Sequence, residues 1–262
     1  MKRVVIKDTI MELWRGNISY VILTIMAIGL IQSISATYAF KEIQWVKSIE
    51  IINVKKYAYM GSLFLFSFIW KGIVISVLGS FAFSKYSFSD KLSFLYLPLK
   101  RSTYLALRAL GFVLFISIFF IVWNITLTLS TIPLKTLSTI EVLIFSVIGD
   151  LLFFLFLSVP LFFGLHLPPI SASFASLILF FIGTAHLLLT PFVNLQISPR
   201  LEKLLTQFPN VISLVMYFPA RYFNVPLGLY DLYPSLKSLA LYLMQFIAFL
   251  VLFILGQKNI EL

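Results

Sequence analysis

The segment from Lys85 to Arg108 reads KYSFSDKLSFLYLPLKRSTYLALR and separates two strongly apolar runs. Its basic side chains are Lys85, Lys91, Lys100, Arg101 and Arg108. This density of charge is unfavourable in hydrocarbon, so we expect the segment to lie in water beside a membrane. Leu92, Leu95 and Leu99 recur at helical spacing. Pro98 interrupts that run, which predicts two short helical pieces joined by a bend.

Two interpretations of this segment fit its composition. Lying against the membrane, it would present a basic and aromatic surface to a partner in the aqueous phase. An ordinary basic loop between two membrane helices accounts for the same residues.

The composition of the whole chain predicts a membrane protein that crosses the bilayer several times. Of its 262 residues, 60% are hydrophobic and only 11% are charged, and the mean hydropathy is +1.01. No gap between apolar runs is long enough for a water-soluble domain, so we expect residues 1–262 to form a single transmembrane domain. The net charge of +10 is scattered over most connections, which favours anionic lipid headgroups over nucleic acid as the partner. The absence of cysteine excludes disulfides and thiolate chemistry.

Six apolar runs are each long enough to cross a bilayer, which takes about 20 helical residues. The predicted spans are 17–40, 57–84, 105–130, 140–163, 169–192 and 237–256. Gly72, Ser76 and Ser80 recur every four positions in the second span, which would let another helix approach closely. Pro168 and Pro169 suit the start of the fifth helix, where a missing N–H costs nothing. The predicted fold class is therefore all-α, with six transmembrane helices.

Two further segments are predicted to lie at the membrane surfaces. Residues 1–16 place Ile6, Ile10, Leu13 and Trp14 on one helical face, which predicts an amphipathic helix in the interface rather than a frayed tail. Residues 195–235 are divided by Pro199, Pro209, Pro219, Pro226 and Pro234. The apolar piece within them, 211–218, is too short to cross, and such a piece can dip into a membrane only where the rest of the protein covers its backbone ends.

The order of residues in the basic segment resembles that of one transporter family. The matching residues are Phe94, Leu95, Pro98, Arg101, Tyr104, Leu105 and Arg108. They resemble the segment after the second span of type-2 ABC exporter permeases, which contacts a separate ATPase subunit and transmits its motion. The resemblance implies a cytoplasmic coupling region at 85–104. Its ATPase-coupling residues would be Leu92, Phe94, Leu95, Pro98, Lys100, Arg101 and Tyr104.

The same resemblance implies an assembly. Two permease subunits in a cell membrane, either identical or one paired with a relative, would enclose a translocation path between them. Each pair of permeases would bind two ATPase chains. The resemblance also implies cytoplasmic termini and an external region of short re-entrant helices at 195–235, whereas the nearly equal numbers of Lys and Arg on the two sides do not decide the orientation. No GxxxxGK[ST] motif occurs, so we expect ATP and Mg to bind to the partner ATPase and no cofactor to bind to this chain.

Enzyme chemistry within the chain is not expected, because it lacks thiols, a GxSxG motif and histidines at metal-ligand spacing. Two rival functions remain open. An ion-coupled secondary carrier would normally show internal repeats, and we find none between the two halves. A structural subunit of a membrane complex would use the basic segment only to contact lipid.

Lys71 and Asp150 are the most informative polar residues within the predicted spans. Both helices run in the same direction in a six-span arrangement, and the two residues differ in depth by about 6 Å, so they are able to pair. The pair has two interpretations: a buried ion pair that orients two helices, or a lysine that lines the translocation path near an anionic substrate group. Gln32, Asn124, His186 and Gln245 are predicted to form hydrogen bonds between helices.

Overall fold

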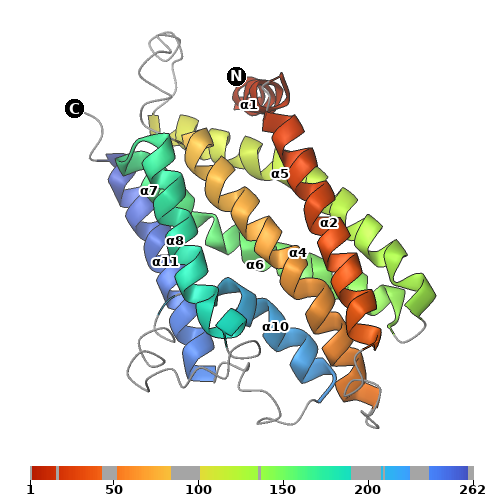
Figure 1. The fold of residues 1–262 in the computed structure, drawn as a ribbon. Helices are drawn as coiled ribbons and strands as arrows, with labels where there is room; N and C mark the ends of the chain where they lie inside the picture. The colour runs from red at the N-terminus through yellow and green to blue at the C-terminus, as the bar shows by residue number, and fades with distance from the viewer. Residues whose placement is uncertain are drawn as a thin grey trace.

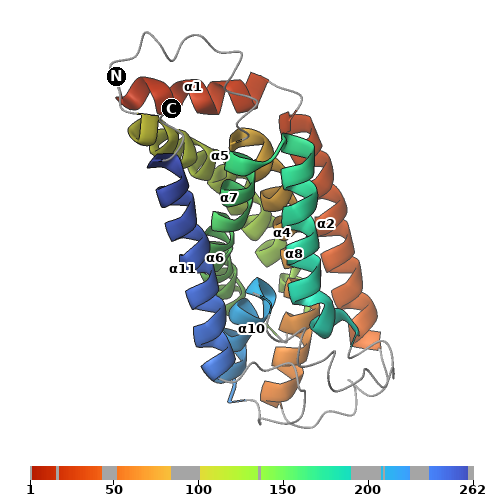
Figure 2. The same ribbon diagram turned by 90° about the vertical axis from the view of Figure 1, so that its left-hand side faces the viewer.

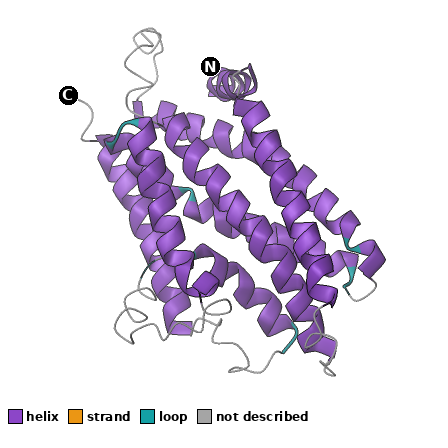
Figure 3. Cartoon of the chain, in the orientation of Figure 1, coloured by secondary structure: helices purple, strands orange, loops and turns teal. Residues whose placement is uncertain are grey.

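The computed structural model describes residues 2–15, 18–42, 52–83, 101–134, 137–189, 208, 210–224 and 236–258. Within these ranges every regular element is a helix, so the predicted all-α class is confirmed for them (Figure 3). The elements are α1 (Lys2–Arg15), α2 (Ile18–Glu42), α4 (Ile52–Phe83), α5 (Arg101–Ser130), η3 (Ile132–Leu134), α6 (Thr139–Phe156), α7 (Ser158–His166), α8 (Pro169–Leu189), α10 (Val211–Tyr222) and α11 (Leu236–Lys258).

Five stretches of helix among these residues are long and apolar enough to cross a membrane, which indicates a multi-pass membrane protein. They are Ser19–Ala39, Ile52–Ala82, Thr103–Ser130, Thr139–His166 and Leu239–Gly256. Each coincides with a predicted span. The remaining predicted span, 169–192, falls on α8, whose apolar part at Pro169–Thr184 is shorter than the five stretches. A sixth crossing therefore stays a prediction.

Most helix bounds differ from the predicted spans by a few residues, and two of the differences have a clear structural cause. Helix α4 begins at Ile52, five residues before the predicted start at Tyr57, because Val54 is buried and continues the packed face. Lys56 is therefore part of the helix, with its Nζ 3.9 Å from Glu141 Oε1 and 5.9 Å from the centre of the Phe223 ring.

The second difference concerns the predicted fourth span, 140–163, which consists of two helices rather than one. Helix α6 ends at Phe156 and α7 begins at Ser158, with Leu157 between them. Pro160 has no N–H to donate to the carbonyl of Phe156, which accounts for the interruption. Helix α8 begins at Pro169 as predicted, and the amide of Ala172 donates to the carbonyl of Pro168 at 2.8 Å.

Helix α1 lies across one end of the bundle, at a large angle to the long helices (Figures 1 and 2). The start of α5 and the ends of α4 and α11 lie at the same end, so both ends of the chain are close to it. Helix α4 packs against α2, α5, α6, α7, α8 and α10. It is therefore the central helix of the bundle.

Helices α4 and α8 approach each other closely, as predicted from the spacing of Gly72, Ser76 and Ser80. The ring of Phe180 on α8 occupies the space where a Cβ on Gly72 would lie. Two turns further along α4, the hydroxyl of Ser80 lies 3.3 Å from the hydroxyl of Ser176 on α8. Large side chains at these positions would hold the two helices apart.

Helix α10 is the described part of the predicted re-entrant region. The side chain of Asn210 accepts a hydrogen bond from the amide of Ser213 at 2.9 Å and caps the helix. Most of its side chains are buried against α4, α6, α8 and α11, at the end of the bundle away from α1 (Figure 1). The predicted helix after Pro199 lies outside the described residues.

We expect Gly72→Ala to destabilise the folded chain by about 1–3 kcal/mol, because the added methyl group meets the Phe180 ring in a packed interface. Thermal unfolding of the purified protein in detergent measures this loss. Gly61→Ala is the matched control on α4, since its methyl group would lie 3.4 Å from the flexible end of Met216. Equal unfolding temperatures for the two variants would contradict the packing described here.

Candidate functional site

The structure brings Lys71 and Asp150 together in the interior of the bundle. Lys71 lies on α4 and is 0% exposed, and Asp150 lies on α6 and is 8% exposed. The Lys71 Nζ donates to Asp150 Oδ1 at 2.5 Å. The two charges therefore form a buried ion pair between helices that run in the same direction.

Asn124 on α5 completes a closed ring of hydrogen bonds with this pair. Its Oδ1 accepts a hydrogen bond from Lys71 Nζ at 2.7 Å, and its Nδ2 donates to Asp150 Oδ2 at 2.6 Å. Both carboxylate oxygens and both ends of the amide thus have a partner. We call Lys71, Asn124 and Asp150 the charge cluster. It joins α4, α5 and α6 at one level.

Aromatic rings surround the ammonium group of the cluster. The Lys71 Nζ lies 4.9 Å from the centre of the Phe120 ring, 5.4 Å from Phe68 and 5.9 Å from Trp123. Each distance is within the range of a cation–π interaction, which is strongest where water is excluded. The rings therefore help to offset the desolvation of the cation as well as packing the core.

A glycine next to Asp150 lets α6 approach α4 at this level. The ring of Phe68 occupies the space where a Cβ on Gly149 would lie. Phe68 also stacks on Phe153 of α6 with ring centres 5.3 Å apart. Because a helical side chain leans toward the N-terminus of its helix, Lys71 extends back toward Phe68 and reaches the carboxylate.

This geometry favours the structural interpretation of the pair. Lys71 is fully enclosed, and its hydrogen-bond partners Asn124 and Asp150 are side chains of the bundle itself. A buried ion pair with complete hydrogen bonding holds its helices in one arrangement, and removal of one partner leaves an uncompensated charge. In this conformation, Lys71 does not line an open path.

A second polar contact joins α1 to the two helices that flank the basic segment. Arg108, on α5, is 4% exposed, and its Nε donates to the carbonyl oxygen of Ala82 near the end of α4 at 3.0 Å. Its Nη1 lies 3.5 Å from Glu12 Oε2 on α1. We call Arg108, Ala82 and Glu12 the Arg108 junction. It ties together three helices at the end of the bundle where α1 lies.

The predicted coupling residues are only partly within the described chain. Leu92, Phe94, Leu95, Pro98 and Lys100 lie outside the described residues. Arg101 is the first residue of α5, and Tyr104 is half-buried in its first turn. The structure therefore places the end of the coupling region on α5 and leaves its contacts as predictions.

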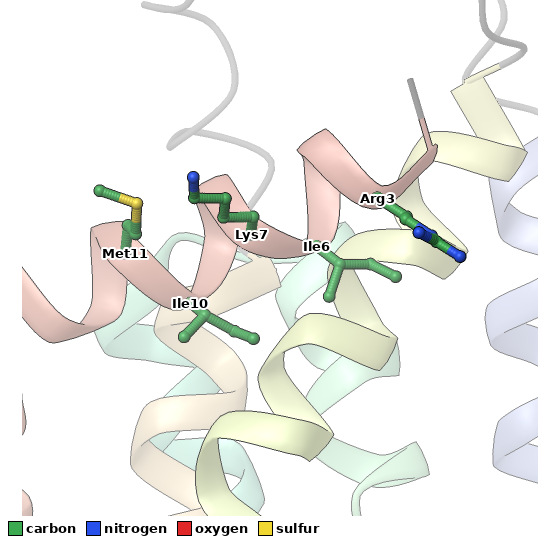
Figure 4. A pocket seen from close by; sticks show the side chains of 5 residues that line it. All are labelled: Arg3, Ile6, Lys7, Ile10 and Met11. Atoms are coloured by element: carbon green, nitrogen blue, oxygen red, sulfur yellow. The ribbon is translucent and has the colours of Figure 1, made fainter.

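Helix α1 is amphipathic, but its buried face is not quite the predicted one. Val5, Thr9 and Leu13 are buried, while Trp14 is 60% exposed and touches the Phe115 ring edge-on. A shallow hollow of about 270 Å³ opens beside this helix (Figure 4). Its lining residues are Arg3, Ile6, Lys7, Ile10 and Met11. The hollow thus combines apolar side chains with two basic ones.

Sequence reasoning found some of these contacts and missed others. Asn124 was expected to bond between helices and does so, and the Gln32 Oε1 likewise accepts from Trp70 Nε1 at 2.7 Å. That Asn124 belongs with Lys71 and Asp150 was missed, although an amide inside an apolar run was the available signal. The pairing of Arg108 with Glu12 was also missed, because the two residues are far apart in sequence. Among the residues described, no group of three or more His, Asp or Glu side chains is placed to hold a metal ion.

We expect Lys71→Met and Asp150→Asn each to destabilise the fold by about 3–5 kcal/mol, because each leaves one buried polar group without its partner. The double variant should recover much of this loss. Thermal unfolding and the yield of folded protein measure both effects. If Lys71→Met left folding intact, the structural interpretation would fail and a role in the translocation path would be favoured.

We expect Arg108→Met to loosen α1 without unfolding the bundle, because it removes the contacts to Ala82 and Glu12. Hydrogen exchange of the α1 amides should rise about tenfold, the factor for a loss of about 1.4 kcal/mol, and α8 should be unaffected. Lys7→Met is the control, since it removes an exposed charge from α1. Unchanged exchange in α1 would argue against the junction as its anchor.

Comparison with known proteins gives no match. No protein-family model matches the chain, and neither a curated protein nor a solved structure matches it. What the chain does therefore has to be inferred from its own helices and buried polar contacts.

Proposed function

We propose that this chain is the transmembrane permease subunit of an ATP-driven exporter resembling the type-2 ABC class. The observation that carries the proposal is the Arg108 junction. It links the helices on both sides of the basic segment, α4 and α5, to the surface helix α1. A force applied to the basic segment would therefore reach three helices together.

The proposed mechanism uses this link. ATP and Mg bind to a separate ATPase pair, whose closure pushes on the coupling region at 85–104. The charge cluster connects α4, α5 and α6 in the interior, so these three helices tilt as a unit and the path between two permease subunits changes sides. The second subunit is an identical copy or a relative.

The membrane arrangement in this proposal has six crossings. Both ends of the described chain lie at one end of the bundle, which supports an even number of crossings (Figure 2). In the proposal, α8, which packs against α4, is the sixth crossing. The shared end faces the cytoplasm of the cell, and α10 lies on the external side as a re-entrant helix. The apolar and basic residues around the hollow on α1 suit the headgroup region of anionic lipids.

A second candidate function is an ion-coupled secondary carrier. The buried Lys71–Asp150 pair favours it, because ionisable pairs inside a membrane often belong to ion or proton pathways. The two functions differ in their energy source. Transport by a carrier proceeds on an ion gradient without ATP.

The proposal predicts that the chain purifies from its native membrane with a soluble ATPase in stoichiometric amount. The complex should hydrolyse ATP, and Leu95→Ala combined with Arg101→Ala should abolish the association, because both residues lie in the predicted coupling region. The measurement is identification of the bound proteins together with ATP hydrolysis by the purified complex.

Arg221→Ala provides the matched control, because this exposed arginine lies on α10 at the opposite end of the bundle and should not affect the association. Recovery with lipid or other membrane chains alone, and no ATPase at any salt concentration, would exclude the exporter. That result would favour the carrier or a structural subunit.

A further inference from the structure

Most hydroxyl side chains inside the bundle bond to their own helix. In each case the hydroxyl donates to the carbonyl four residues earlier, at 2.7–2.9 Å. The buried examples are Ser33, Thr37, Ser80, Ser176 and Thr184. This arrangement satisfies the hydroxyl without any partner outside the helix.

Three buried hydroxyls near the charge cluster behave differently. Ser67 is 0% exposed, Ser146 is 1% exposed and Thr128 is 9% exposed. None of the three has a hydrogen-bond partner among the described residues. The same holds for the buried hydroxyl of Ser76, which lies five residues from Lys71 on the side of the cluster toward α1 and so is not part of this group. None of these hydroxyls bonds to the carbonyl four residues earlier, although an unpaired hydroxyl in a buried site is unfavourable.

The spacing of these hydroxyls relates each of them to one member of the charge cluster. Ser67 lies four residues from Lys71, Thr128 four from Asn124, and Ser146 four from Asp150. Four residues along a helix is one turn, about 6 Å, on the same face. The three hydroxyls therefore form a second polar layer, one turn away from the charge cluster.

All three hydroxyls lie on the same side of the charge cluster along the length of the bundle. Helices α4 and α6 run toward the end where α1 lies, and α5 starts at that end and runs away from it. Moving four residues toward the N-terminus of α4 or α6, or four residues toward the C-terminus of α5, therefore leads away from α1. The second layer lies on the side of the cluster toward the opposite end of the bundle.

The packing of α5 against α6 supports the same register. Phe120 stacks on Phe154 with ring centres 6.1 Å apart, and Asn124 bonds to Asp150 one turn further along. The next step of four residues brings Thr128 opposite Ser146. Lys71 pairs with Asp150 between the parallel helices α4 and α6, so a step of four residues back along both helices brings Ser67 to the level of Ser146.

We propose that Ser67, Thr128 and Ser146 bind internal water between α4, α5 and α6. Hydroxyl groups both donate and accept, and a buried water molecule typically makes about three hydrogen bonds to groups that lack other partners. The adjacent charge cluster contains one cation and one anion, so its net charge does not recruit an ion. Water is the small neutral ligand that satisfies these groups.

This site extends the polar interior by one turn beyond the ion pair. The bundle then holds two polar layers, one charged and one hydrated, within helices that are otherwise apolar. The inference is independent of the exporter proposal, because it rests only on side chains of this chain.

Thr128→Val tests the proposal, because valine keeps the shape of threonine and removes only the hydroxyl. If the hydroxyl holds water, the variant of the purified full chain should unfold about 2–4 °C lower, the shift for loss of an ordinary hydrogen bond in a chain of this size. Thr184→Val is the control, since Thr184 is also buried and its hydroxyl donates to the carbonyls of Phe180 and Phe181 in its own helix, a type of bond that adds little to helix stability. It should unfold close to the original temperature.

A double-variant cycle makes the test specific to a shared ligand. Ser67→Ala and Ser146→Ala should each lower the unfolding temperature, and together they should lower it by less than the sum, because both lose the same water. A density map of the unmodified protein in a lipid disc should show a water peak within hydrogen-bond distance of the three hydroxyl oxygens.

Three results would overturn the proposal. A raised or unchanged unfolding temperature for Thr128→Val would show an unpaired hydroxyl in a dry site. Additive effects of the two serine variants would exclude a shared ligand. An empty space between the three oxygens in a map that resolves other waters would exclude it directly, whatever the variants do.

Discussion

The ion pair between Lys71 and Asp150 is the constraint on which the centre of the bundle depends. A charge within apolar helices needs a partner at a defined distance, so α4 and α6 are held at one mutual depth. Asn124 adds α5 to this arrangement by bonding to both charges. Because Gly149 has no side chain, the ring of Phe68 fits between α4 and α6 at this level. The ion pair and the ring packing around it together fix the register of these helices.

The Arg108 junction imposes a similar constraint at the edge of the bundle. Helix α1 is only 14 residues long and packs mainly on α5. Arg108 gives it an electrostatic anchor on the same helix that carries Asn124. The interior contact and the surface contact are therefore joined through α5. This continuity is what makes a mechanical role for the basic segment physically reasonable.

Much of the helical plan was predictable because apolar runs of bilayer length have few alternatives. The start of α8 at Pro169 and the close approach at Gly72 followed from local rules that need no knowledge of the fold. The early start of α4 was not predictable from hydropathy, because Lys55 and Lys56 suggested a connection. The burial of Val54 and the contacts of Lys56 with Glu141 and Phe223 explain why this stretch is part of the helix.

In the candidate site too, single residues were recognisable from the sequence, whereas contacts that depend on helix packing were not. Lys71 and Asp150 were recognisable because charges are rare in apolar runs, and their similar depths suggested the pair. Asn124 could not be assigned to it, because the antiparallel register of α5 against α6 depends on ring packing such as that of Phe120 with Phe154. For the same reason, no local pattern distinguishes the hydroxyl of Thr128 from that of Thr184.

The interruption between α6 and α7 divides one membrane crossing into halves with different neighbours. Helix α6 packs mainly on α5 and α10, whereas α7 packs mainly on α11, α4 and α8. Because Pro160 has no N–H to donate to the carbonyl of Phe156, one helical hydrogen bond that would resist bending is missing beside Leu157. Sliding of one group of helices past the other would concentrate at this point, so the crossing has a built-in hinge. Half of it would remain fixed to the ion pair while the other half followed α11.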